Sequence, residues 1–332
     1  MTSVPKLNTV KMWALNFLNE EINTEMRVGI SLPQLGPQAS PENLIKVASR
    51  AEQLGYDSAW VLERLLWPLN PKEPYPAVPD GRLPETYQIV FDPIETLTFV
   101  AAHTKKLQLG TSVLVLPYHT PIQLARRIAT LDVLSGGRAL VGVGVGWSHD
   151  EFEAAGTPFE RRGARCNEFL SAMIELWTKD PVKFEGQFYH IPESKVGPKP
   201  IQKPHPPIYV AGFGQYTFDR AVNYGNGWNP AGIMSLEQME GMINQFRRTA
   251  ETAGRSDMEV VLRSFTMVLK QSPGADRHPM IGTLDEIRED TRRLRDIGVT
   301  HLIQSPPAIG FDPAASIDDV LDVMEQLIEV SK

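Results

Sequence analysis

The residue types best suited to charge and proton chemistry stand just after predicted strands. Glu63 ends a predicted strand at 57–63 and Arg64 follows it, and His119 and His149 follow two later strands. Arg64 keeps its charge at any ordinary pH, so it can stabilise negative charge but cannot act as an ordinary acid or base. Either histidine could serve as a general acid near neutral pH. The alternatives are a surface salt bridge between Glu63 and Arg64, and histidines that make only structural hydrogen bonds.

The segment 139–146, ALVGVGVG, alternates small and β-branched side chains, which predicts a fully buried parallel strand. Glycine at its carboxyl end would let a ligand approach the backbone. Gly142, Gly144 and Gly146 are spaced as G-x-G-x-G and are followed by Trp147, which does not fit the G-x-G-x-x-G pattern of a dinucleotide site. Glycines that only relieve crowding inside a barrel are the remaining alternative.

Alternating strands and helices must position these candidates. The expected strands cover residues 27–33, 57–63, 107–116, 139–146, 207–212, 228–230, 258–269 and 301–305. Helices are expected between them, with a cap at Ser40 and capping boxes that begin at Ser235 and Thr283. Eight such units in about 300 residues are typical of an α/β protein with a (β/α)8 TIM barrel, whose ligands bind at the carboxyl ends of the strands.

Two insertions interrupt the alternation. Residues 64–91 are rich in proline and aromatic side chains, and so long a loop after a strand is usually functional. We expect it to cover an apolar substrate pocket. Residues 182–206 should contain a hairpin. Residues 1–25 are expected to be an N-terminal extension, and 26–332 a single barrel domain.

Composition excludes several classes of function. The chain has 332 residues, 42% of them hydrophobic, and a net charge of −7, without a Lys/Arg cluster that would favour nucleic acid or anionic membranes. The single cysteine, Cys166, excludes an internal disulfide, and no zinc-type spacing occurs, so no metal is expected. No apolar run reaches the roughly 18 residues of a membrane span, and the N-terminus lacks a secretion signal. We therefore expect a cytoplasmic protein that acts on a small molecule.

The run from Gly144 to Arg165, GVGWSHDEFEAAGTPFERRGAR, resembles the luciferase-like monooxygenase superfamily, especially its branch that uses the deazaflavin coenzyme F420. Residues 197–229 and 110–117 resemble further strands of that family, so the resemblance covers about residues 26–330. It implies hydride transfer between F420 and a small, apolar organic substrate, and a homodimer. Two alternatives stay open: a monooxygenase of the alkanesulfonate or luciferase kind that uses reduced FMN and oxygen, and a non-catalytic flavin-binding barrel.

The resemblance also implies where a coenzyme would lie. Ser112 and Val113 fall where the family often has a non-proline cis peptide against the coenzyme's ring, and we expect that bond here. Gly212, Phe213 and Gly214 fall where backbone N–H groups contact phosphate at a helix start. An ordinary turn between a strand and a helix is the alternative for this segment.

Further coenzyme contacts are expected from Glu63, Gly144, Gly146, Trp147 and Arg162. Arg162 could instead pair with a nearby carboxylate. Glu63 and Arg64 stand where the sugar-phosphate dehydrogenases of this family have an Asp-His pair, and Trp147 stands where they have a glutamate proton donor. Their mechanism therefore does not transfer, and we expect Arg64, Glu63 and His149 to be the catalytic residues.

Overall fold

The parallel sheet closes on itself, because its first strand pairs with both the second and the last. The structure is a computed structural model that describes residues 25–78, 80–307, 309 and 316–332. In it, β1 (Arg27–Ser31) lies between β2 (Ser58–Val61) and β13 (His301–Ser305). The ring continues through β3 (Gln108–Val115), β4 (Ala139–Gly144), β7 (Ile208–Ala211), β8 (Gly227–Asn229) and β10 (Glu259–Phe265), which pairs with β13. The predicted (β/α)8 barrel is confirmed.

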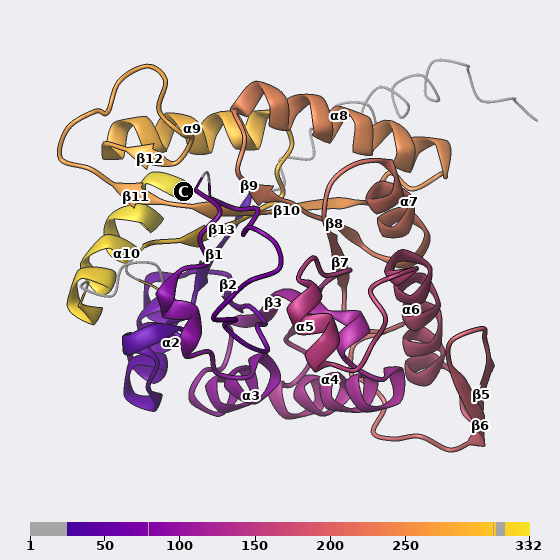
Figure 1. Cartoon of the computed structure of the whole chain (residues 1–332). Helices are drawn as coiled ribbons and strands as arrows, with labels where there is room; N and C mark the ends of the chain where they lie inside the picture. The colour runs from indigo at the N-terminus through magenta and orange to yellow at the C-terminus, as the bar shows by residue number, and fades with distance from the viewer. Residues whose placement is uncertain (1–24, 79, 308, 310–315) are drawn as a thin grey trace, which may run out of the picture.

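Helices surround the strands on the outside of the barrel (Figure 1). They are α2 (Pro41–Leu54), α3 (Pro93–His103), α4 (Pro121–Ser135), α6 (Arg162–Thr178), α7 (Gln215–Tyr224), α8 (Leu236–Thr252), α9 (Leu284–Asp296) and α10 (Ile317–Ser331). Short 3-10 helices cover Gly36–Gln38, Glu85–Gln88 and Leu116–Tyr118. Among the described helices, none is both long enough and apolar enough to cross a bilayer.

Local signals start and stop these helices where the sequence predicts. The Ser40 hydroxyl caps α2, Pro41 takes its first position, and Gly55 ends it in the left-handed region with a φ of 81°. The capping boxes that begin at Ser235 and Thr283 are both formed, at α8 and α9. Because a cap needs only a few neighbouring residues, it can be read from the sequence without knowledge of the fold.

The sixth and seventh strands differ from the expectation. Pro230, which has no N–H for a ladder, separates β8 from β9 (Ala231–Gly232), and both pair with β10. The seventh strand ends at Phe265, earlier than expected. Residues beyond it form β11 (Met267–Val268), which pairs with β12 (Ile281–Gly282) outside the barrel sheet.

One short α-helix among the described residues was not predicted. This is α5 (His149–Ala154), whose N-terminus is capped by the Ser148 hydroxyl. The predicted hairpin is present as β5 (Val182–Glu185) and β6 (His190–Ser194). The predicted N-terminal extension, residues 1–25, lies almost wholly outside the described residues.

Large side chains fill the barrel interior. Trp60 donates a hydrogen bond from Nε1 to Ser58 Oγ at 2.6 Å, and Ser58 Oγ lies 2.6 Å from His301 Nε2. Burial lowers the pKa of His301 well below its usual range, so this histidine is a neutral core group. The innermost cluster consists of Trp60, Leu140, Tyr209, Val261 and Ile303. Since the interior is packed, a ligand must bind at the mouth.

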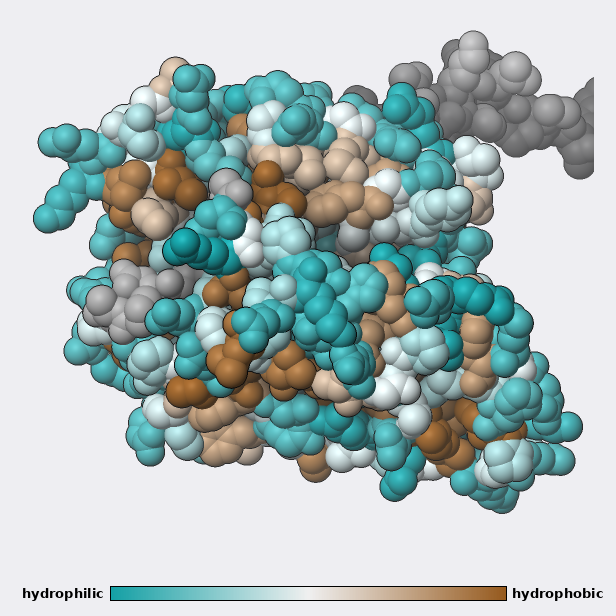
Figure 2. Space-filling view, viewed as in Figure 1, coloured by the Kyte–Doolittle hydropathy of each residue, from teal (hydrophilic) through white to brown (hydrophobic). Residues whose placement is uncertain are grey.

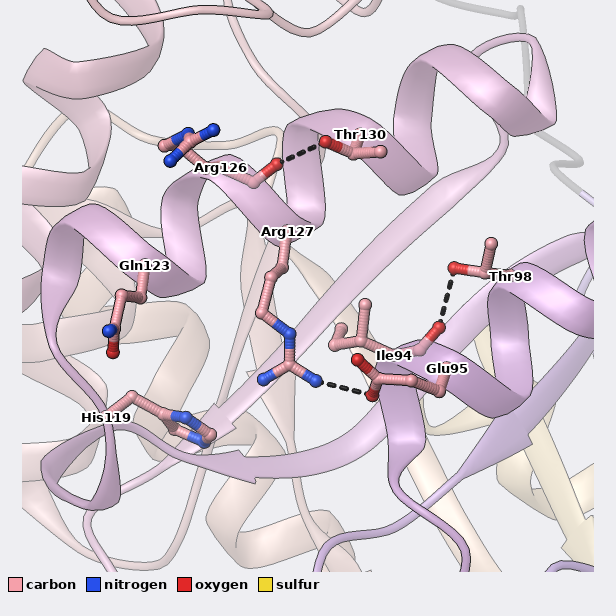
Figure 3. A pocket seen from close by; sticks show the side chains of 8 residues that line it. All are labelled: Ile94, Glu95, Thr98, His119, Gln123, Arg126, Arg127 and Thr130. Carbon is pink, nitrogen blue, oxygen red and sulfur yellow. Dashed lines mark hydrogen bonds and ion pairs between the residues drawn. The ribbon is translucent and has the colours of Figure 1, made fainter.

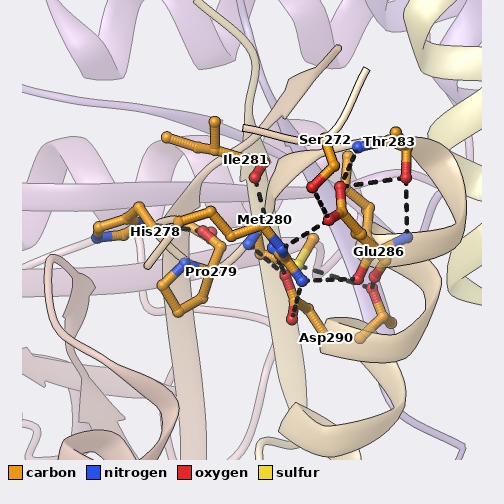
Figure 4. Close-up of polar contacts among 12 residues, drawn as sticks. Ser272, His278, Pro279, Met280, Ile281, Thr283, Glu286 and Asp290 are labelled. Atoms are coloured by element: carbon orange, nitrogen blue, oxygen red, sulfur yellow. Dashed lines mark hydrogen bonds and ion pairs between the residues drawn. The ribbon is translucent and has the colours of Figure 1, made fainter. Parts of the chain in front are cut away.

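The insertion after β10 is held to α9 by a largely buried ion pair (Figure 4). Arg277 donates hydrogen bonds of 2.6 and 2.9 Å to the two carboxylate oxygens of Asp290, which also accepts one of 2.7 Å from Met280 N. Met280 is buried and has a φ of 64°, which is uncommon for a residue other than glycine. Asp290 thus fixes a loop that follows the carboxyl end of a barrel strand.

Asp290→Ala is expected to lower the free energy of unfolding by about 2 kcal/mol, because it removes the shortest hydrogen bonds of the Arg277 guanidinium and leaves the buried Met280 N–H without its acceptor. Urea unfolding followed by circular dichroism measures this. Glu289→Ala, at the neighbouring exposed position on α9, is the control and should stay within about 0.5 kcal/mol of the wild type. Equal effects of the two substitutions would contradict the assigned role of Asp290.

Candidate functional site

Arg64 lies at the centre of the candidate site. Its side chain is 6% exposed, and its Nη1 is 3.2 Å from Glu151 Oε2. The guanidinium lies over the rings of Trp147 and Tyr87, at 5.0 and 5.8 Å from their centroids. Its Nε and Nη2 are buried, and no described residue accepts a hydrogen bond from either. Buried donors without partners are costly. These two N–H groups are therefore suited to an acceptor on a ligand.

Glu151 reaches Arg64 because α5 turns the chain back over the mouth. Ser148 caps this helix by accepting a hydrogen bond from Glu151 N. The Glu151 carboxylate accepts hydrogen bonds from Leu65 N at 2.7 Å and from the Tyr118 hydroxyl at 3.2 Å. Burial raises the pKa of the Glu151 carboxyl, and the Arg64 charge opposes that rise. The result is a buried acid beside a permanent cation.

Glu63 pairs with a histidine and not with its neighbour in the chain. Its Oε1 lies 2.7 Å from His119 Nε2, and its Oε2 accepts a hydrogen bond of 2.6 Å from Val115 N. The Glu63 side chain is buried. The alternative of a surface salt bridge between Glu63 and Arg64 is therefore wrong, because each side chain is buried against a different partner.

The expected non-proline cis peptide is present between Ser112 and Val113. The Ser112 carbonyl accepts a hydrogen bond of 2.9 Å from Arg263 Nη1, and the Ser112 hydroxyl donates one of 3.0 Å to Asn229 Oδ1. Sequence reasoning missed Arg263. The available signal was an arginine in the middle of a mainly apolar predicted strand, residues 258–269. The contact of this peptide with a coenzyme stays a prediction.

The floor of the mouth is nearly filled. A cavity of about 10 Å³ lies among its lining side chains, which include Ser31, Gln34, Trp60, Ser112 and Arg263. This volume holds about one water molecule. The space among these residues is therefore too small for a flat ring, and a ring that binds at the mouth would have to lie above them.

The three glycines in and just after β4, Gly142, Gly144 and Gly146, differ in how closely other atoms surround them. A Cβ added at Gly142 would lie 1.9 Å from the Thr111 carbonyl oxygen, and Gly146, with a φ of 77°, is crowded by side chains. These two positions support the alternative that glycine relieves crowding. A Cβ at Gly144 would meet only the Val113 side chain, at 3.0 Å. Gly144 thus lies beside the cis peptide.

The turn before α7 has the geometry of an anion-binding segment. Gly212 and Gly214 have φ values of 120° and 82°, and Gly214 precedes the first residue of the helix without any side-chain cap. The exposed Phe213 ring packs edge-on against Trp228, whose Nε1 donates a hydrogen bond of 2.8 Å to the Gly212 carbonyl. Free N–H groups at a helix start favour phosphate. This role also stays a prediction.

His149 fastens α5 to the long loop. Its ring Nδ1 lies against a carboxylate oxygen of Glu73, its backbone N donates a hydrogen bond of 3.1 Å to the other oxygen, and its ring stacks on Phe159 with centroids 3.6 Å apart. The helix lies in front of the strands in Figure 1, and hydrophilic residues cover this region in Figure 2, with hydrophobic groups beside them. These contacts suit an anchor for the segment 64–91. Catalysis by His149 stays a prediction.

The Arg162 side chain contacts the same region, at a backbone carbonyl and at an aromatic ring. Its Nε donates a hydrogen bond of 3.3 Å to the Gly146 carbonyl, and its guanidinium lies 3.9 Å from the Phe159 ring centroid. No described carboxylate forms an ion pair with Arg162, so its charge is available to a phosphate group. Within the described part of the chain, no three His, Cys, Asp or Glu side chains gather as metal ligands. The free donors thus suit an organic ligand with polar and anionic groups.

A model of the luciferase-like monooxygenase family matches residues 24–278. The chain belongs to this family. The family expected from the sequence is therefore confirmed, and its members provide named relatives for comparison.

Three relatives of this luciferase-like chain cover different shares of it. An uncharacterized protein of Mycobacterium tuberculosis is 37% identical over 183 residues, which are 54% of this chain and 64% of that protein. An F420-dependent glucose-6-phosphate dehydrogenase of Amycolatopsis mediterranei is 33% identical over 58% of this chain and 54% of its own length. An FMNH2-dependent dimethylsulfone monooxygenase of Pseudomonas putida is 33% identical over 47% and 43%. The matches thus span about two thirds of these relatives or less.

Two solved structures have the same fold as this luciferase-like barrel. The monooxygenase RslO1 from Streptomyces bottropensis has a TM-score of 0.76 at 23% identity, covering 92% of this chain and 98% of that one. An F420-dependent secondary alcohol dehydrogenase in complex with an F420–acetone adduct has a TM-score of 0.74 at 18% identity, covering 93% and 99%. At such identities the likeness concerns the fold.

Proposed function

We propose that the chain is an oxidoreductase that transfers a hydride between coenzyme F420 and a small organic substrate. The observation that carries this proposal is the buried Arg64, whose Nε and Nη2 have no described acceptor and which is flanked by Trp147 and Tyr87. Family membership and an F420-dependent relative support it. We also propose a homodimer in the cytoplasm, as the family resemblance implies.

The coenzyme, when bound, supplies the hydride chemistry. In our proposal the turn at 212–214 and Arg162 hold its phosphate, while the peptide between Ser112 and Val113 and the backbone at Gly144 support its ring. Arg263 and Asn229 hold that peptide from below. Glu63, Gly146 and Trp147 complete the proposed coenzyme contacts, and His149 is kept as a proposed catalytic residue.

The substrate would lie between the ring and the long loop. The walls of this substrate pocket would be aromatic, because Tyr75 packs against both Trp147 and Tyr87 at ring-centroid distances of 5.6 and 5.9 Å. Arg64 would bind a substrate oxygen through Nε and Nη2, two parallel donors on one edge of its guanidinium. Preorganised donors of this kind stabilise the negative charge that develops as a carbonyl is reduced. An apolar carbonyl compound or the matching alcohol fits this arrangement.

Fluorescence titration of the coenzyme-free protein with F420 and with FMN tests the proposal. We expect F420 to bind at least about 100-fold more tightly, a difference of about 2.7 kcal/mol. Tight FMN binding without F420 binding would contradict the proposed coenzyme. Tight binding without turnover of any alcohol, ketone or enone would favour the non-catalytic barrel.

A monooxygenase that uses reduced FMN and oxygen is the second candidate. The Pseudomonas putida relative, 33% identical over 158 residues, specifically favours it. In that case Arg64 would stabilise negative charge on the bound substrate through its free Nε and Nη2. Oxygen consumption that depends on reduced FMN distinguishes this candidate, since hydride transfer with F420 consumes no oxygen.

A further inference from the structure

Two buried acid–base pairs lie side by side beneath the mouth. One is Arg64 with Glu151, and the other is Glu63 with His119. The chain connects the two pairs at two points. Glu63 and Arg64 are neighbours in the sequence, and so are His119 and Tyr118, whose hydroxyl donates a hydrogen bond to Glu151. The negative charge of Glu63 also raises the pKa of Glu151, so the protonation of Glu151 depends on the neighbouring pair.

The charges of this cluster do not balance unless it holds a proton. With both carboxylates ionised and His119 neutral, the sum is two negative charges and one positive charge. A proton on either Glu151 or His119 brings the sum to zero. Since an uncompensated charge is costly in a buried site, the cluster should retain one proton and should replace it when it is lost.

His119 connects the cluster to solvent on the outer wall of the barrel. It lines a cavity of about 610 Å³ between α3 and α4, away from the packed floor of the mouth (Figure 3). The exposed residues Gln123 and Arg126 line the same cavity, so water reaches it. Arg127 and Glu95, which form an ion pair with each other, face His119 there. The nearby charged groups on the outer side thus include Arg127 with its two carboxylate partners, Asp92 and Glu95, and Arg126.

We propose that His119 is a charge-compensating residue, which takes a proton from the outer cavity when the Arg64–Glu151 pair releases one at the mouth. The role in turnover rests on the proposed function, whereas the charge balance itself does not. When a substrate carbonyl carbon receives a hydride, the two electrons of that hydride form the new C–H bond. The C=O π electrons move to the oxygen, which takes the proton from Glu151. His119 then gains a proton from water, and the buried charge returns to zero.

After product leaves, the cluster resets. Glu151 regains a proton through the open mouth, and His119 returns its own to the outer cavity. No proton has to travel between the two pairs. Proton exchange between His119 and the outer cavity can therefore restore the total charge of the cluster while the loop at 64–91 covers the mouth.

Thermal unfolding against pH tests the charge balance in the coenzyme-free protein. A carboxyl whose pKa is raised by folding stabilises at low pH, and that stability is lost as the pH rises through the folded pKa. In His119→Gln only the carboxyls can hold the cluster's proton. We therefore expect its Tm to fall earlier than that of the wild type as the pH rises from about 5 to about 9. The double variant Glu63→Gln/His119→Gln has one carboxylate fewer, and its Tm should not fall in this way.

Turnover tests the compensation. His119→Gln should lower kcat by about tenfold at neutral pH, because the negative charge left when Glu151 gives up its proton is then not compensated. Gln123→Ala, which opens the same cavity without contacting Glu63, should match the wild type. A kcat of His119→Gln equal to that of the wild type, or a double variant whose Tm falls with rising pH as that of the single variant does, would overturn the proposal and leave His119 a structural residue. If the wild type turns nothing over, the proposed function fails while the Tm profiles still decide the charge balance.

Discussion

Arg64→Lys is expected to lower kcat by about 100-fold to 1,000-fold while leaving the Kd of the coenzyme within about threefold. Lysine keeps a positive charge beside Glu151, so the buried pair survives. It lacks the planar fork, so the two parallel donors at Nε and Nη2 are lost. The substitution therefore separates donor geometry from charge. Steady-state kinetics, with a substrate found by screening small alcohols, ketones and enones, and fluorescence titration of the coenzyme measure the two effects.

Arg82→Lys is the matched control, because Arg82 lies exposed in the same loop and should tolerate the change. An unchanged kcat in Arg64→Lys would remove Arg64 from the mechanism. A large loss of coenzyme affinity with unchanged kcat would instead place Arg64 against the coenzyme. Arg64→Gln leaves Glu151 without its cation, so its loss of stability should exceed that of Arg64→Lys.

Gly142→Ala is expected to lower the free energy of unfolding by about 3 kcal/mol or more. The new Cβ would stand 1.9 Å from the Thr111 carbonyl oxygen, which belongs to the neighbouring strand of the closed barrel. A backbone atom in a barrel ladder cannot move aside as the end of a flexible side chain can, so the strands must separate. Urea unfolding measures the change.

Gly241→Ala, the same exchange of glycine for alanine at another position, is expected to raise the free energy of unfolding. Gly241 lies inside α8, and a Cβ there meets nothing within 4 Å. This variant should gain roughly 0.5 to 1 kcal/mol, because alanine favours the helix and restricts the unfolded chain. If both variants behaved alike, the assigned contact between Gly142 and Thr111 would be wrong.

The site could be predicted only in part from sequence. The family resemblance located the cis peptide at Ser112 and Val113, which the structure contains. Arg64 was identified as a charged group at a strand end, whereas the alternative that paired it with Glu63 was wrong. Sequence neighbours are poor guides here, because successive residues after a strand point in different directions. Glu63 therefore turns to His119, and Arg64 turns to Glu151.

The sequence by itself determined the eight alternating units, the caps of α2, α8 and α9, and the family. These features depend on the period of apolar residues and on hydrogen bonds within a few positions, so they are local. Only the tertiary structure decided which charges meet. Arg263 and Ser112 lie 151 positions apart in the chain, yet closure of the barrel brings them within hydrogen-bond distance. Such contacts follow from the geometry of the whole ring, which no local pattern encodes.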